Sequence, residues 1–98
     1  MPVHVIIDIK VINKDMYGEY IQKVPPTVKK FGGRYLARGE KITILSGDWH
    51  PERVILLEFD NVEQARNWLT SREYAKVAPL REKSTITNAI LIESDPLP

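Results

Sequence analysis

Two segments of the chain carry apolar side chains at every second position, which is the pattern of β-strands. In residues 3–12 one face of the predicted strand is apolar without a gap, and the other face is mixed. Residues 53–59 alternate in the same way. Residues 34–38 and 85–92 are predicted as two further strands.

A helical pattern separates the first two strands. Apolar residues between positions 17 and 31 recur at three- and four-residue spacing, and the turn at residues 13–15 can cap this helix. Pro25-Pro26 interrupts the pattern and predicts a break or a kink, because proline removes a backbone hydrogen bond and clashes with the preceding turn. Gly32-Gly33 is predicted to end the helix, since glycine adopts positive φ at little steric cost.

The second half of the chain follows a similar plan. Residues 42–45 form a short β-prone run before the strand at residues 53–59. Asp60-Asn61 can cap a helix that buries Trp68. Thr70 and Glu73 have the spacing of a capping box, which predicts a fresh helical piece from there to about Arg81.

The predicted order of elements is strand, helix, strand, strand, helix, strand. That order is typical of an α+β, ferredoxin-like βαββαβ sandwich with an antiparallel sheet. The whole chain, residues 1–98, is predicted to form this one domain. No internal repeat or low-complexity segment competes with this interpretation.

Helices cover only one face of such a sheet, so the composition of the other face indicates what it meets. That second face is neither polar enough for water nor apolar enough for a dry core, and it consists of His4, Ile6, Asp8, Lys10, Val54, Leu56 and Glu58. We expect two such faces to pack together in a homodimer. Asp8 and Glu58 then need cationic partners, and Arg38 is preferred because its planar guanidinium can hold a carboxylate in two places.

Composition narrows the functional classes. The 14 Lys and Arg residues nearly balance the 13 Asp and Glu residues, which gives no electrostatic case for nucleic acid or an anionic membrane as partner. The chain has no cysteine, so disulfides and thiolate chemistry are excluded and a cytoplasmic location is expected. The N-terminal residues do not resemble a signal peptide, and no segment is long enough to span a bilayer.

Candidate chemistry gathers near the second and third strands. Trp49 could wall a cleft for a small planar or apolar ligand, and Arg38 or Arg53 could hold a carboxylate or an enolate oxygen. Tyr35 and Arg38 point to opposite faces of one strand, unless a bulge intervenes. The candidate ligand-binding residues are Tyr35, Arg38, Asp48, Trp49, His50, Arg53 and Glu58.

The two histidines carry little chemistry of their own. His50 could be oriented by Asp48 as a base, but a solvent-facing loop histidine is the simpler interpretation. His4 is expected to be a satisfied side chain at the sheet interface. Since the two share no ligand spacing, no metal site is predicted, and no cofactor is expected.

Five segments of the chain together match the pattern of one known family: Phe31–Gly39 (FGGRYLARG), Gly47–Arg53 (GDWHPER), Glu58-Phe59, Ser71–Tyr74 (SREY) and Leu80-Arg81. They resemble domain of unknown function family 1330. Ser71–Tyr74 departs from the family pattern at Arg72, where a proline often stands, and this difference concerns helix initiation only.

That resemblance implies a dimeric α/β-barrel, in which two ferredoxin-like subunits pack sheet to sheet. The superfamily includes cofactor-free monooxygenases, lactone isomerases, haem-dependent enzymes and ligand-sensing domains. The family itself brings no reaction that can be transferred to this chain.

Two functional hypotheses follow. In the first, a small homodimer binds a small anionic or aromatic molecule, and a narrower version makes it a cofactor-independent enzyme such as a monooxygenase or isomerase. In the second, the protein is a non-enzymatic structural or regulatory dimer whose charged residues serve the sheet interface. The role of Arg38 distinguishes the two.

Overall fold

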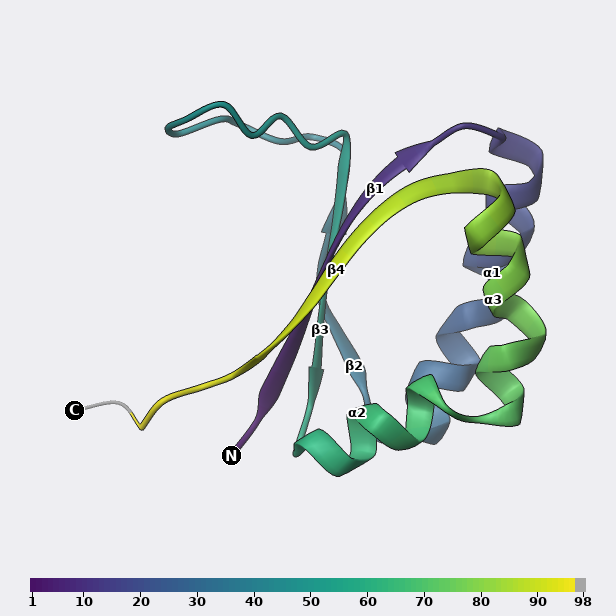
Figure 1. Ribbon diagram of the computed structural model, residues 1–98, viewed down its shortest axis with the longest axis vertical. Coiled ribbons are helices and arrows are strands. Elements are labelled where there is room, and N and C mark those ends of the chain that lie inside the picture. The colour runs from purple at the N-terminus through teal and green to yellow at the C-terminus, as the bar shows by residue number, and fades with distance from the viewer. Residues whose placement is uncertain (97–98) are drawn as a thin grey trace.

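The fold is a four-stranded antiparallel sheet with three helices (Figure 1). The computed structural model describes residues 1–96. The sheet order is β2-β3-β1-β4, with every neighbouring pair antiparallel, which confirms the predicted βαββαβ arrangement. The elements along the chain are β1 (Val3–Val11), α1 (Lys14–Lys30), β2 (Arg34–Gly39), β3 (Arg53–Phe59), α2 (Val62–Leu69), α3 (Arg72–Ser84) and β4 (Thr85–Glu93).

All three helices lie on one side of the sheet, and the core fills the layer between them (Figure 1). Phe59 of β3 and Trp68 of α2 are almost fully buried, with ring centroids 5.6 Å apart. The Trp68 indole donates to Thr27 Oγ1 at 2.9 Å, and the Thr27 hydroxyl donates onward to the Val24 carbonyl at 2.7 Å. The polar atoms of this core are therefore satisfied without water.

Helix α1 runs unbroken through Pro25 and Pro26, so the predicted break is wrong. The two prolines remove the donors that would reach the carbonyls of Ile21 and Gln22. Both of those residues are exposed, so water can satisfy their carbonyls. The helix is held in place around the prolines by the burial of Val24, Thr27 and Val28.

The glycine pair ends α1 as predicted, with a different task for each glycine. Gly32 has φ +82°, the left-handed conformation that ends a helix. Gly33 instead leaves room for a close approach: a Cβ there would lie 2.6 Å from Phe59 and 2.7 Å from Val28. The exit from α1 is therefore fixed by packing as well as by backbone conformation.

The helix beginnings show one difference from the prediction. Asn13 and Asn61 cap α1 and α2 by accepting from the backbone N–H groups of Met16 and Gln64. Ser71, not Thr70, caps α3, because Thr70 is still bound to the last turn of α2 through its N–H and hydroxyl. The predicted capping box between Thr70 and Glu73 is therefore wrong: the residue three positions after the Ser71 cap is Tyr74, and the Ser71 N–H donates to the Trp68 carbonyl instead.

Residues 40–52 form an arm that projects from the sheet between β2 and β3 (Figure 1). The β-prone residues 42–45 lie in this arm and form no strand, in keeping with the predicted order of elements, which does not count them as one. Ile44 and Leu45 are exposed, and no strand within residues 1–96 offers them a ladder of hydrogen bonds. Trp49 ties the arm to β1 by donating from its indole nitrogen to Asp8 Oδ2 at 2.9 Å.

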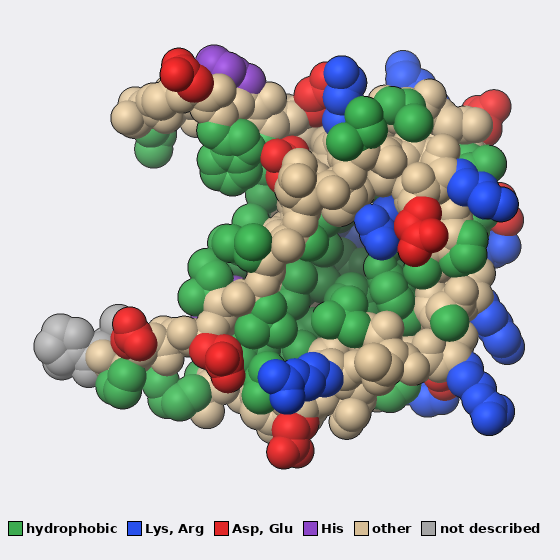
Figure 2. All heavy atoms as spheres, in the orientation of Figure 1, with side chains coloured by type: hydrophobic (Ala, Val, Ile, Leu, Met, Phe, Trp, Pro, Cys, Tyr) green, Lys and Arg blue, Asp and Glu red, His purple; other side chains and the backbone are tan. Residues whose placement is uncertain are grey.

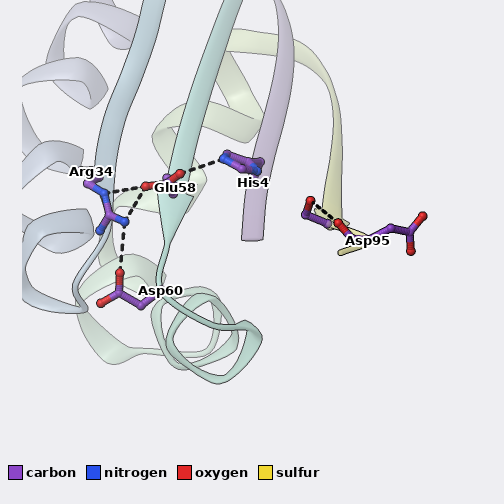
Figure 3. Close-up of polar contacts among 6 residues, drawn as sticks. His4, Arg34, Glu58, Asp60 and Asp95 are labelled. Carbon is purple, nitrogen blue, oxygen red and sulfur yellow. Dashed lines mark hydrogen bonds and ion pairs between the residues drawn. The ribbon is translucent and has the colours of Figure 1, made fainter. Parts of the chain in front are cut away.

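An ionic chain crosses the face of the sheet that the helices leave open (Figure 3). His4 Nε2 lies 2.8 Å from Glu58 Oε2, Arg34 Nε donates to Glu58 Oε1 at 2.8 Å, and Arg34 Nη2 lies 3.0 Å from Asp60. The Arg34 hydrogen bond, followed by that of His4, lowers the pKa of Glu58. The expected Arg38–Glu58 pair is wrong: Arg34 is the cross-strand partner of Glu58, and Asp8 is bound by Trp49.

Replacement of Gly33 by Ala is expected to destabilise the fold by about 1–3 kcal/mol, because the added methyl group overpacks the contact with Phe59. Gly39→Ala is the matched control, since nothing lies within 4 Å of the Cβ that it adds. Chemical denaturation of both variants measures the difference. Equal free energies of unfolding for the two variants would show that Phe59 and Val28 make room for the added methyl group at no cost in stability.

Glu58→Gln is expected to lower the thermal unfolding midpoint at neutral pH. Because the folded-state pKa of Glu58 lies below its ordinary value of about 4.5, the carboxylate stabilises the fold above that value. The contribution disappears as the pH falls through the folded-state pKa, so the two melting curves should converge in acid. Glu52→Gln, in the exposed arm, should follow the wild type at every pH, and a pH-independent deficit for Glu58→Gln would argue against the ionic chain.

Candidate functional site

A cavity of about 350 Å³ lies between the sheet and the helices. Figure 2 shows that this layer is hollowed and that hydrophobic side chains line the hollow. Ile7, Ile55 and Leu57 form part of its wall on the sheet side, and Val24 and Trp68 close it on the helix side. The polar side chains that reach it are Tyr20, Gln22, Tyr35, Arg38, Arg53 and Arg81.

A bulge in β2 brings two of the predicted site residues to the same face. The register with β3 shifts between Tyr35 and Ala37, so Leu36 is an extra residue. Tyr35 then lies opposite Leu57 and Arg38 opposite Ile55. Because Leu57 and Ile55 both face the core, Tyr35 and Arg38 both line the cavity, and the bulge is the exception under which the sequence allows this.

Each arginine of the cavity is associated with a tyrosine. Arg53 Nε donates to the Tyr17 hydroxyl at 2.9 Å, and Arg81 Nε donates to the Tyr74 hydroxyl at 3.2 Å. The Arg38 guanidinium lies 5.4 Å from the centre of the Tyr35 ring, within reach of a cation–π interaction. Tyr17 also stacks on Tyr20, so the chain's 4 tyrosines all contribute to this region.

The electrostatics favour hydrogen-bond donors over acceptors. Burial, together with the neighbouring Tyr74, raises the pKa of Tyr20 far above its ordinary value. Burial also raises the pKa of Tyr35, although Arg38 opposes this shift. Both phenols are therefore protonated at neutral pH and can donate. The Tyr17 hydroxyl accepts from Arg53, which leaves its own proton free to donate.

The cavity is cationic. Its wall contains three guanidinium groups and, within residues 1–96, no Asp or Glu side chain. The nearest carboxylates are those of Glu40, 3.4 Å from Arg53, and Glu82, 4.0 Å from Arg81. Burial alone would lower the pKa of Arg81, but Tyr74 and Tyr20 raise it, so this guanidinium stays charged.

The structure separates the seven predicted site residues into three groups. Tyr35, Arg38 and Arg53 meet at the cavity. Glu58 lies on the open face of the sheet in the ionic chain of Figure 3. Asp48, Trp49 and His50 belong to the arm, and all three are exposed.

His50 is an exposed loop residue, which is the interpretation that the sequence favours over a base oriented by Asp48. Within the part of the chain that the structure describes, no hydrogen bond joins Asp48 to His50. Trp49 lines two recesses on the far side of the sheet, one beside Asp8 and Ile90 and one beside Leu45. It therefore walls surface recesses rather than the cavity with the arginines.

Tyr20 and Arg81 are cavity residues that the sequence does not predict for the site. Both come from helices, where their spacing gives only a weak signal. Tyr20 follows Tyr17 and precedes Val24 on the buried stripe of α1. Arg81 stands seven positions after Tyr74, so the two lie on one side of α3, and this spacing is the one signal that could have found it.

Residues 1–96 hold no cluster of three or more His, Asp or Glu side chains placed to bind a metal ion. No helix in this described part is long and apolar enough to cross a membrane. The chemistry of the cavity comes from its guanidinium and phenol groups.

Comparison with solved structures shows the same fold in proteins of distant sequence. RPA0582 of Rhodopseudomonas palustris, of unknown function, is 17% identical with a TM-score of 0.80, over 97% of this chain and 84% of its own. SnoaB of Streptomyces nogalater, a cofactor-independent oxygenase, is 9% identical with a TM-score of 0.68, over 98% and 95%. A dimeric ferredoxin-like protein of unknown function from Thermobifida fusca is 12% identical with a TM-score of 0.68, over 94% and 90%.

These likenesses extend to the fold alone, because each identity is far below 25%. No curated protein matches the sequence. The family comparison is more direct, since it covers the strands, the helices and the arm together. The sequence profile of a domain of unknown function, DUF1330, matches residues 2–95, and the chain belongs to this family.

Proposed function

We propose that the protein is a homodimer that binds a small organic anion with an apolar body in the cavity between sheet and helices. The observation that carries this proposal is the convergence of Arg38, Arg53 and Arg81 on a space without a lining carboxylate. Guanidinium groups in a partly dry site bind carboxylates through charge-assisted hydrogen bonds. The cavity is thus selective for charge.

The shape of the cavity supports an amphipathic ligand. The exposed lining residues Ile21, Gln22 and Arg38 form its rim, whereas Leu57 and Trp68 are buried at its inner end. A ligand with one anionic group and an apolar remainder satisfies both parts. The volume of about 350 Å³ is near the lower end of ligand pockets, which favours a small molecule.

The lining favours binding over proton abstraction. The high pKa values of Tyr20 and Tyr35 keep these phenols protonated, so they donate hydrogen bonds and do not act as bases at neutral pH. Among the described lining residues there is no imidazole or carboxylate. SnoaB shares the fold and is a cofactor-independent oxygenase. For this chain we propose ligand binding rather than catalysis, because binding requires only the residues that line the cavity.

The open face of the sheet supports the homodimer. Ile86, Ile90 and Ile92 of β4 and Leu36 of β2 are large apolar side chains with 42–58% of their surface exposed. Burial of such a side chain contributes about 1.5–3 kcal/mol, and two copies together can offset the cost of association. In Figure 2 hydrophobic side chains line the notch between the arm and the C-terminal end. The Thermobifida fusca neighbour with this fold is described as dimeric.

Arg38→Gln is expected to weaken binding of a small carboxylate roughly 10–100-fold, the effect of losing one charged hydrogen-bond donor. Benzoate and hexanoate are suitable probes, and benzamide is the uncharged comparison. Isothermal titration measures the affinities. Arg72→Gln, at an exposed site on α3, is the control and should bind as the wild type does. If no carboxylate binds the wild type, the proposal fails.

Ile90→Lys is expected to shift the protein from dimer to monomer in sedimentation velocity, because it places a charge on the open face midway along β4, where Ile90 lies opposite Ile6. Leu69→Lys on α2 is the matched control, since Leu69 is also exposed (47% against 58%) but lies in the helical layer. A wild-type monomer, or equal effects of the two substitutions, would contradict dimerisation through the sheet.

A further inference from the structure

Glu40, the first residue of the arm, reaches back to an arginine of the cavity. Its Oε1 lies 3.4 Å from Arg53 Nη1. The Glu40 side chain is 73% exposed and that of Arg53 is 16% exposed, so Glu40 approaches the guanidinium from the solvent side. No other acidic side chain in residues 1–96 pairs with Arg53.

A second contact, with Tyr17, orients the Arg53 guanidinium. Its Nε donates to the Tyr17 hydroxyl at 2.9 Å, and its guanidinium lies 5.8 Å from the centre of the Tyr17 ring. Tyr17 therefore fixes the orientation of the guanidinium, while Glu40 contacts it at Nη1. The Nη1 group thus already has a carboxylate as its acceptor.

Arg38 lies next to this position. It is opposite Ile55, two residues along β3 from Arg53 and on the same face, which makes the two arginines diagonal neighbours. Within the described residues Arg38 has no ion pair, only the Tyr35 ring. A ligand carboxylate bound to Arg53 would thus lie beside the guanidinium of Arg38, which has no ion pair of its own within the described residues.

We infer that Glu40 is an internal competitor for the cavity, and that the ligand is a monocarboxylate whose headgroup displaces Glu40 from Arg53. This inference rests on the proposed function, because it concerns the same cavity. A ligand carboxylate between Arg38 and Arg53 gains a donor that Glu40 does not use and carries its apolar part into the cavity. The Glu40 contact is weak enough to exchange, because it is long and exposed.

Displacement of Glu40 also changes the arm. Within residues 1–96, two polar side-chain contacts join the arm to the rest of the chain, Glu40 with Arg53 on the cavity side and Trp49 with Asp8 on the open face. Entry of the ligand removes the first and leaves the second. Glu40 thereby sets the affinity for carboxylates and holds the base of the arm when the cavity is empty.

Glu40→Gln is expected to bind benzoate and hexanoate about 2–5-fold more tightly than the wild type, the range that corresponds to loss of an exposed ion pair. Isothermal titration of the full chain measures these affinities, with benzamide as the uncharged comparison. Glu52→Gln is the matched control: it removes the same charge from the other end of the arm, where the carboxylate has no ion pair within the described residues. It should bind as the wild type does.

The outcomes separate this inference from the function on which it rests. If the wild type binds carboxylates and the two variants bind equally, or if Glu40→Gln binds more weakly, the competitor role is wrong and the anion site stands. If benzamide gains as much as benzoate, the substitution acts through something other than charge competition, and the inference is overturned. If neither the wild type nor Glu40→Gln binds any carboxylate, both proposals fail.

Discussion

The bulge in β2 is the constraint on which the rest of the site depends. A regular strand would place Tyr35 and Arg38 on opposite faces, and only one of them could reach the helical layer. The extra residue, Leu36, puts both side chains over β3 and leaves Arg34 on the open face beside Glu58. One irregular residue therefore assigns one arginine to the ionic chain and another to the cavity.

The sequence predicts the order of the elements well, because that order rests on periodicity and on a few strong signals such as Gly32-Gly33 and the cap at Asn61. It predicts the site less well, because the site depends on register. Alternation of apolar and polar residues cannot reveal a bulge, and in a strand without the bulge Arg38 would lie on the open face, where it could pair with Glu58. Nor does the sequence pattern show that α1 can continue through Pro25 and Pro26, since that depends on whether water reaches the carbonyls of Ile21 and Gln22.

Two faces of one sheet perform different tasks with similar residue types. On the open face the Glu58 carboxylate is bound by the His4 imidazole and the Arg34 guanidinium, so the contacts run across three strands. On the helical face Arg53 and Arg81 are bound to uncharged phenols, and their carboxylate contacts, to Glu40 and Glu82, are long and exposed. The guanidinium groups of the helical face can therefore still attract an anion, whereas the guanidinium of Arg34 on the open face is already paired with the carboxylates of Glu58 and Asp60.

The arm contact between Trp49 and Asp8 gives the protein a built-in optical probe. The chain has 2 tryptophans, one buried in the core at Trp68 and one 59% exposed at Trp49. A buried indole and a solvated one emit at different wavelengths, so the fluorescence of Trp49 reports the arm while that of Trp68 reports the core. Opening of the arm and unfolding of the domain can thus be followed as separate events in one unlabelled sample.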